Sequence, residues 1–303
     1  LWVEWKLSVQ GISYNTCVQA TLDGPVDPAL FSHAIATVVA RYQLLHGYCQ
    51  EQDGAPKIAL SSEPYSMDII DVSEGSELET TAARQRALAI LNRKRDAAIN
   101  LAAFPLVRSA LVKTGAQRWY FIGVVPHIIS DGYSAVFILQ AISRIYNAGA
   151  NASAPAPTDD DGESRKDWSD YLQWRSEVPE QKHIDAREYW RNALHGAEHF
   201  TPITQRAATA TDTLGRRRYF ALDADVSKRL GKLAFAQRTS LFSSLAALYA
   251  AFLYRRTDQQ DILIAHPVDL RPPGFRDAFG FYVNIVPLRV DLTESPSFTE
   301  LVR

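Results

Sequence analysis

The most informative stretch of this sequence is His127-Ile-Ile-Ser-Asp131-Gly132. It follows the apolar run 119–125, which is typical of a buried strand, and precedes the run 133–142, which has the pattern of a helix. A histidine therefore stands at a strand end, where an imidazole can take up a proton and return it near neutral pH. Asp131 lies four residues on, past a tight turn, and its carboxylate can hold that turn through a buried salt bridge. Gly132 permits backbone angles that other residues resist and lets a substrate come close.

The motif has a plain structural alternative. Histidines at strand ends are often satisfied core groups, and His-x-x-x-Asp matches many unrelated sequences. The order of strand, histidine, Asp-Gly turn and amphipathic helix is more specific than these residues alone, and it favours a functional site. Pro126 has no backbone N–H and a fixed φ, so we expect the strand to end or to lie unpaired there.

The stretch resembles the His-His-x-x-x-Asp-Gly signature of nonribosomal peptide synthetase condensation domains and their acyltransferase relatives. Pro126 replaces the first histidine, and the resemblance assigns the chemistry to the second, His127. The resemblance spans the whole chain, and the ordered set of segments is more specific than any one of them. The other matching segments are 1–2, 41–45, 105–108, 171–174, 280–284 and 287–289.

The mixture of helical and strand patterns in both halves predicts an α/β fold with mixed sheets. The resemblance implies two lobes of the chloramphenicol acetyltransferase type that face each other across a tunnel. We expect an N-terminal lobe over 1–158, which holds the motif, an acidic linker over 159–166 and a C-terminal lobe over 167–303. The family extends well past the last matching segment, so we expect an incomplete second lobe and a chain that is a fragment of a longer polypeptide.

Local patterns predict the individual elements. Asp27 and Pro28 are typical of a helix start, and that helix is expected to run to about residue 45. Further helices are expected at 78–99, 133–147, 168–176, 180–195, 225–237 and 240–255. Strands are expected at 16–22, 105–113, 118–125, 217–222, 261–266 and 282–292, and a loop at 148–166.

Around the histidine, the resemblance implies a small set of supporting residues. His127 is the expected base or positioning group, and Asp131 is expected to pair with Arg271. The alternative for Arg271 is a surface arginine in the proline-rich turn 269–273. A backbone N–H near Gly132 is a candidate to face a developing oxyanion.

Three more residues are candidates for lining the tunnel: Ser130, Tyr133 and Asn284. For Asn284, an equally good interpretation is a polar residue that closes a strand edge. His266 ends a predicted strand and could be a second active-site histidine, but a structural role is favoured because the resemblance gives that position none.

Composition argues against several kinds of partner. The net charge is −2 with no basic block, so neither nucleic acid nor an anionic membrane surface is expected. No apolar run approaches the roughly 20 residues of a membrane span. The only two cysteines, Cys17 and Cys49, make no disulfide framework or zinc site, and a reducing cytoplasm is the expected location. His195 and His199 are four apart, but a surface pair is favoured over a zinc site, and we expect no metal.

The function that the resemblance implies is condensation. A donor acyl or peptidyl thioester on the phosphopantetheine arm of one peptidyl carrier protein would be joined to an acceptor amine on a second, with an ester product as a variant. The expected partners are these carrier proteins and neighbouring synthetase domains, and no directly bound cofactor is expected. The alternatives are a stand-alone acyl-CoA acyltransferase, an epimerisation domain and a non-catalytic docking domain. Val283-Asn284 disfavours the first, because it replaces the Asp-Phe-Gly-Trp-Gly motif of the plant-type enzymes.

Overall fold

The computed structural model of the chain describes residues 1–7, 14–150, 166–198 and 220–302. It divides into two compact units, the first formed by Leu1–Glu177 with Leu270–Val283 and the second by Val178–Asp269 with Asn284–Arg303. Residues 270–283 thus return to the unit that contains His127. The predicted linker at 159–166 lies outside the described residues, apart from Lys166.

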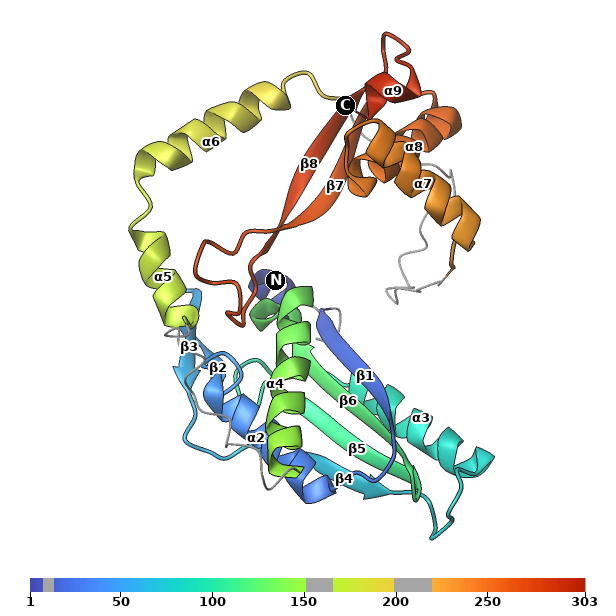
Figure 1. The fold of residues 1–303 in the computed structure, drawn as a ribbon. Coiled ribbons are helices and arrows are strands. Elements are labelled where there is room, and N and C mark those ends of the chain that lie inside the picture. The colour runs from blue at the N-terminus through green and yellow to red at the C-terminus, as the bar shows by residue number, and fades with distance from the viewer. Residues whose placement is uncertain (8–13, 151–165, 199–219, 303) are drawn as a thin grey trace. The chain divides into compact units, whose positions relative to one another are not determined.

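The first unit is built on a four-stranded sheet with the strand order β1-β6-β5-β4 (Figure 1). Strand β6 pairs antiparallel with both β1 and β5, whereas β4 pairs parallel with β5. Most residues of β5 and β6 are buried on both faces, which is why their sequences are nearly continuous apolar runs. The strands are β1 (Asn15–Asp23), β4 (Asp68–Asp71), β5 (Arg108–Gly115) and β6 (Arg118–Pro126).

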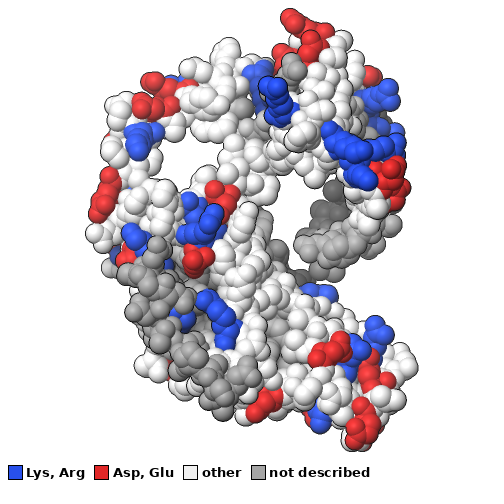
Figure 2. Space-filling view, viewed as in Figure 1, with Lys and Arg blue, Asp and Glu red and all other residues white. Residues whose placement is uncertain are grey.

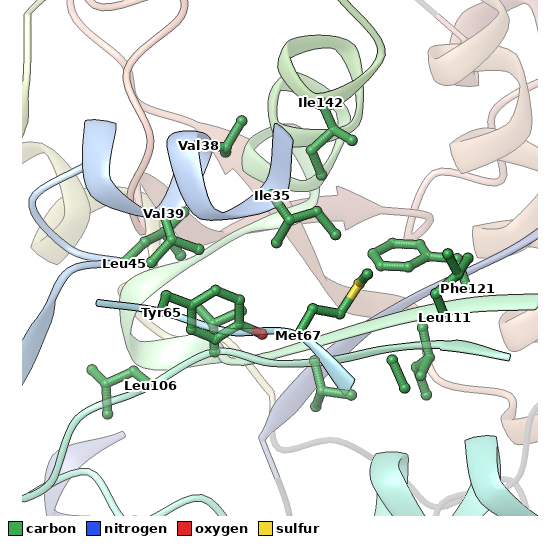
Figure 3. Packing of buried hydrophobic residues seen from close by; sticks show 14 of the residues in the cluster. Ile35, Val38, Val39, Leu45, Tyr65, Met67, Leu106, Leu111, Phe121 and Ile142 are labelled. Carbon is green, nitrogen blue, oxygen red and sulfur yellow. The ribbon is translucent and has the colours of Figure 1, made fainter. Parts of the chain in front are cut away.

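Helices cover both faces of this sheet. Helices α2 and α4 pack against each other on one face, and α3 lies on the other, against β5 and β6 (Figures 1 and 3). The predicted cap of α2 is confirmed, because Asp27 Oδ1 accepts the N–H groups of Ala29 and Leu30 at 2.9 and 3.0 Å. These helices are α2 (Pro28–Arg41), α3 (Thr81–Asp96) and α4 (Gly132–Ala150).

Several helix ends differ from the predictions, and α3 (Thr81–Asp96) is shorter at both ends than the helix expected at 78–99. Helix α2 stops at Arg41 and does not reach residue 45, because Tyr42 has extended backbone and the next residues form a turn closed by the Leu45 N–H to Tyr42 carbonyl bond. Helix α4 continues to Ala150, so residues 148–150 are helical and not part of a loop. The rest of the expected loop, 151–165, lies outside the described residues.

The main hydrophobic core fills the space between the sheet and its helices (Figure 3). On one face, Ile35 and Val38 of α2 and Ile142 of α4 pack over the side chain of Phe121 in β6. Leu111 of β5 is fully buried. Burial of such side chains is the dominant favourable term in folding, so this core provides a rigid base for the loop that follows β6.

The sequence patterns missed three strands of the first unit. Strands β2 (Gly47–Gln52) and β3 (Ala55–Leu60) form a separate two-stranded sheet. Their turn has positive φ at Asp53 and Gly54, 53° and 77°, as a type I′ turn requires, and Asp-Gly is its usual sequence signal. This hairpin could therefore have been predicted, whereas the four-residue edge strand β4 has no comparable signal.

The remaining helices of the first unit are short. Helix α1 (Trp2–Leu7) lies near the start of the chain, and α5 (Trp168–Ser176) begins at a capping box formed by Asp167 and Asp170. From α5, Tyr171 packs edge-to-face against Tyr282 and against Phe275. This aromatic cluster is one of the contacts that hold residues 270–283 to the first unit.

The second unit has a much smaller core, made by Ala250, Leu253, Ile262 and Leu292. Strands β7 and β8 form its two-stranded sheet. Its elements are α6 (Glu180–Ala193), α7 (Ala224–Ala236), α8 (Leu241–Thr257), β7 (Asp261–Asp269), β8 (Val283–Asp291, which begins at the unit boundary) and α9 (Phe298–Leu301).

Two strand predictions for the second unit need correction. The segment 261–266 is not a short buried strand, because β7 runs on to Asp269 and only Asp261 and Ile262 in it are buried. Of the strand expected at 217–222, residues 217–219 lie outside the described residues, and 220–222 do not form a strand.

The surface is mixed in charge. On the face shown in Figure 2, acidic and basic side chains are interspersed, and neither sign forms an extended patch. Within the described ranges, no helix is both long enough and apolar enough to cross a membrane.

Candidate active site

The loop that carries His127 begins where β6 ends. Strand β6 stops at Pro126, which pairs in register with Asn15, as expected for a residue that cannot continue the ladder. One 3-10 turn, His127–Ile129, follows, and the His127 N–H donates to the Tyr14 carbonyl at 2.6 Å. The backbone of the histidine is therefore anchored to the chain just before β1, and it lies at the end of an inner strand of the sheet.

The imidazole of His127 is held at one ring atom by its own loop. Its Nδ1 lies 2.6 Å from the carbonyl oxygen of Ser130. Because a carbonyl only accepts, we assign the proton of the neutral ring to Nδ1, which leaves a lone pair on Nε2. The ring also meets that of Phe281 edge-to-face, with centroids 5.2 Å apart and planes at 89°. Nε2 is thus the atom available to a reacting group.

The carboxylate of Asp131 is fully buried, and both of its oxygens accept hydrogen bonds. Its Oδ1 accepts from Arg271 Nη2 at 2.8 Å and from the Ser134 N–H at 2.9 Å, and its Oδ2 accepts the Tyr282 N–H at 3.0 Å. Burial raises the pKa of Asp131, but the bonds from Arg271, Ser134 and Tyr282 outweigh burial and hold that pKa below its ordinary value. Asp131 is therefore an anion that organises the loop.

Arg271 lies where the resemblance implied, beside Asp131, and the alternative of a surface arginine is wrong, since its side chain is 3% exposed. Its Nε donates to the Ala278 carbonyl at 3.3 Å. Its guanidinium lies 4.6 Å from the ring centroid of Tyr282 and 5.6 Å from that of Tyr133. These contacts compensate the desolvation of a cation that would otherwise be costly to bury.

The structure brings other predicted residues to different places. Gly132 opens α4 without a left-handed φ, so the backbone freedom that glycine permits is not used there. A Cβ there would meet no atom within 4 Å, which leaves room for close approach. Ser130 is buried and its hydroxyl donates to the Pro126 carbonyl, whereas Tyr133 is 55% exposed. Asn284 is exposed in the second unit, and its side chain accepts the Ile285 N–H.

Two residues of this site, Ser134 and Phe281, had no predicted role. Ser134 is fully buried, and its Oγ lies 2.9 Å from Asp131 Oδ1 and 2.7 Å from the Gly280 carbonyl oxygen. Its position three residues after an Asp at a helix start was a usable signal for capping. For Phe281, no local pattern indicates a contact with His127.

An apolar cavity of about 50 Å³ lies beside the motif, inside the first unit. It is bounded by the helices α2 and α4 and by one face of the sheet, and Ser130 and Phe279 border it. Its walls are almost entirely carbon, so it suits a hydrocarbon group and not a charged one. Other residues that line it are Val18, Val38, Phe121, Ala135 and Ile138.

The other candidate residues of the sequence are three histidines and two cysteines. His195 belongs to the second unit, where its carbonyl accepts from Arg289, and His199 lies outside the described residues. His266 packs against Phe242 in the second unit. Among the described residues, no group of 3 or more His, Cys, Asp or Glu side chains could hold a metal ion. Cys17 and Cys49 are free thiols whose pKa is raised by burial, for Cys49 to about 11.

Comparisons with curated proteins point to one kind of relative. The chain is 28% identical to a linear gramicidin synthase polypeptide of Brevibacillus parabrevis over 100% of its own length and 6% of that protein. It is 29% identical to cyclosporin synthetase of Tolypocladium inflatum, with coverage of 100% and 2%. Against a plipastatin synthase polypeptide of Bacillus subtilis (strain 168) the identity is 27%, with coverage of 95% and 11%. The chain therefore matches a small part of each much longer polypeptide.

Solved structures share the fold. A starter condensation domain of rhizomide synthetase, a mutant in complex with C8-CoA, matches with a TM-score of 0.81 and 24% identity over 99% of this chain and 66% of that chain. The first condensation domain of the calcium-dependent antibiotic synthetase matches with a TM-score of 0.78 and 23% identity over 99% and 69%. These similarities confirm the predicted mixed α/β fold. The family model described as "Condensation domain" matches residues 1–303, and the chain belongs to that family.

Proposed function

We propose that this chain is the condensation domain of a nonribosomal peptide synthetase, an acyltransferase that joins a donor acyl or peptidyl thioester to an acceptor amine. The donor and the acceptor would each be carried on the phosphopantetheine arm of a peptidyl carrier protein, next to further synthetase domains. The observation that carries the proposal is the His127 imidazole, whose Nδ1 is tied to the Ser130 carbonyl at 2.6 Å while Nε2 keeps its lone pair.

The reaction follows from this arrangement. The acceptor nitrogen attacks the thioester carbonyl, the C–S bond breaks, and an amide and a free thiol on the donor arm are the products. His127 Nε2 either accepts the amine proton and passes it to the departing sulfur, or orients the amine and stabilises the tetrahedral species. Holding both reactants in place can lower the barrier by ~7–11 kcal/mol in the best cases. The open space at Gly132 and the backbone N–H at the start of α4 suit the developing oxyanion.

The apolar cavity beside Ser130 supports a donor with a hydrocarbon portion. Most of its residues come from α2, α4 and the sheet, so its size is set mainly by the core. Nothing in its lining would compensate the charge of a carboxylate or an ammonium group. We therefore favour donors whose acyl group is apolar close to the thioester. An ester product would require only a hydroxyl in place of the acceptor amine.

The family match favours this function over an epimerisation domain, a docking domain and a stand-alone acyl-CoA enzyme. A carrier-dependent enzyme discriminates an acyl group on a carrier protein from the same group on free coenzyme A. At equal donor concentrations, we expect faster turnover with the carrier-bound donor. Faster turnover with acyl-CoA would support the stand-alone acyltransferase instead.

The decisive experiment measures product on the acceptor carrier protein by intact mass, with both carriers loaded. His127→Ala should keep the fold and lose ~10²–10⁴ in rate, the usual contribution of general acid–base catalysis. His33→Ala is a matched control, because His33 is an exposed histidine on α2 of the same unit. Product formation at the wild-type rate by a folded His127→Ala protein would remove the imidazole from the mechanism.

A further inference from the structure

We propose that Phe281 is a positioning residue for His127, and that the backbone of Gly280–Tyr282 acts as a clamp that holds the Phe281 ring against the imidazole. The inference rests on the proposed function. That function requires His127, and the inference assigns Phe281 a role toward this histidine. It is carried by the edge-to-face contact of the two rings, at 5.2 Å and 89°, and by the hydrogen bonds on both sides of Phe281.

One hydrogen bond does not orient an imidazole. The bond from Nδ1 to the Ser130 carbonyl fixes one ring atom, but the terminal torsion of a histidine is broad, so the ring can still tilt about that bond. Tilting moves Nε2, which lies across the ring from Nδ1. An aromatic edge-to-face contact has a preferred geometry, and Phe281 therefore supplies the second constraint that sets the direction of the Nε2 lone pair.

The backbone before Phe281 is fixed by Ser134. The Gly280 N–H donates to Ser134 Oγ at 3.1 Å, and the same Oγ lies 2.7 Å from the Gly280 carbonyl oxygen. A hydroxyl has one proton and two lone pairs, so that proton serves either this carbonyl or Asp131 Oδ1, which lies 2.9 Å away. Both polar groups of Gly280 thus meet a fully buried hydroxyl on the first turn of α4.

The backbone after Phe281 is fixed by Asp131. The Tyr282 N–H donates to Asp131 Oδ2 at 3.0 Å, and the Tyr282 carbonyl accepts the Leu270 N–H at 2.9 Å. The bond from Tyr282 to Asp131 is buried, where hydrogen bonds are strong and hard to exchange with water. Asp131 therefore acts on His127 through the Tyr282 backbone and the Phe281 ring, whereas Nδ1 of the imidazole donates to the Ser130 carbonyl.

The path of the clamp also requires glycine at position 280. A Cβ there would come within 2.6 Å of the Tyr282 ring, which is 3% exposed and packed against Arg271. That ring has little room to move, so a larger residue would displace the backbone next to Phe281. The clamp is thus a fitted structure in which Gly280, Ser134 and Asp131 fix the backbone and Phe281 meets the histidine.

The kinetic test compares Phe281→Leu, which keeps apolar volume but removes the ring, with Phe281→Tyr, which keeps the ring. We expect Phe281→Leu to lower kcat ~10–100-fold with KM within about twofold, as expected for a misplaced catalytic group, and Phe281→Tyr to stay within about threefold of wild type. Phe235→Leu is the control and should have no effect, because Phe235 is 86% exposed on α7. Thermal melts establish that each variant is folded.

A double mutant separates positioning from a general structural role. In a His127→Ala background, Phe281→Leu should cause no further fall in rate, because its effect passes through the imidazole. An equal fall in both backgrounds would overturn the proposal, because Phe281 would then act on the substrate or on the fold.

A spectroscopic readout makes the outcome independent of activity. The ring protons of His127, identified by their loss in His127→Ala, should change chemical shift in Phe281→Leu, because the ring current of Phe281 is removed, and should not change in Phe235→Leu. Unchanged His127 shifts in a folded Phe281→Leu protein would overturn the proposal whatever the activity. A second combination of results is also informative. If Phe281→Leu shows the predicted shift change but the wild-type protein gives no product with loaded carrier proteins, the contact is supported and the proposed function is rejected.

Discussion

Each of the two compact units contains an Asp–Arg pair, and the two pairs differ in burial. In the first unit, Asp131 and Arg271 lie 2.8 Å apart with side chains 0% and 3% exposed. In the second, Arg289 binds both carboxylate oxygens of Asp261 at 2.8 Å, with the Asp261 side chain 11% and that of Arg289 32% exposed. The geometry of the second pair is at least as good, so distance does not distinguish them.

The difference lies in what surrounds each pair. Arg289 also donates to the carbonyl groups of Ala193 and His195, and Asp261 accepts the Glu198 N–H, so this pair fastens the chain after α6 to the sheet of the second unit. Water still reaches Arg289. Asp131 and Arg271, by contrast, are shielded from solvent, so loss of one group leaves a buried charge without compensation. The first pair should therefore matter more to stability, although Arg289 binds both carboxylate oxygens of Asp261.

The largest expected effect is that of Asp131→Ala, at ~3–5 kcal/mol of unfolding free energy, because it leaves Arg271 as an unpaired buried cation. Denaturant titration of Asp131→Ala, Arg271→Ala and the double mutant measures the coupling between them. We expect the double mutant to be more stable than the sum of the single losses implies. Strictly additive losses would mean that the two side chains do not interact in solution.

Asp261→Ala should cost less than Asp131→Ala, because solvent can hydrate the Arg289 side chain that it leaves behind. Its loss should be local, with faster hydrogen exchange in peptides that contain 193–198 and 261–269 and little change around His127. Hydrogen–deuterium exchange followed by mass spectrometry checks this. Equal destabilisation by Asp131→Ala and Asp261→Ala would show that burial is not what separates the two pairs.

Acid should weaken both pairs. The pKa of Asp131 is raised by burial but lowered more by the hydrogen bonds from Arg271, Ser134 and Tyr282, and that of Asp261 is lowered mainly by the bonds from Arg289. Because the folded pKa lies below the unfolded one, near ~3.9, the stabilisation is present above that pH and is lost as pH falls through the folded pKa. The stability gap between wild type and Asp131→Asn should therefore shrink below about pH 4. A gap that stays constant from neutral pH to acid would contradict the assignment of Asp131 as an anion.

The smallest effect is expected from an exposed pair. Arg229 and Asp225 on α7 lie 3.0 Å apart, with side chains 69% and 76% exposed. Arg229→Ala should change the unfolding free energy by no more than about 0.5 kcal/mol, because exposed helix pairs contribute little. The same denaturant titration measures it. A loss comparable to that of Asp261→Ala would show that the contribution of these ion pairs to stability does not decrease with their exposure.

The sequence by itself determined the local structure around the site. The strand that ends at Pro126, the helix after Gly132 and the cap at Asp27 all follow from interactions between near neighbours, which leave periodic or capping patterns in the chain. Asp53-Gly54 carried the same kind of signal for the β2–β3 hairpin, although it was missed. The pairing of Asp131 with Arg271 came from the family resemblance and not from any pattern of spacing.

Only the tertiary structure decided how the site is closed. That residues 270–283 return to the first unit, that Ser134 meets both polar groups of Gly280, and that Phe281 lies against His127 are contacts between segments far apart in the chain. Such contacts depend on the path of the backbone and on the close packing of buried side chains. A periodic pattern in the sequence contains information about neither. The sequence by itself therefore determined which loop carries the histidine. The packing of a distant segment decided which way its ring faces, because a single local hydrogen bond leaves the ring free to tilt.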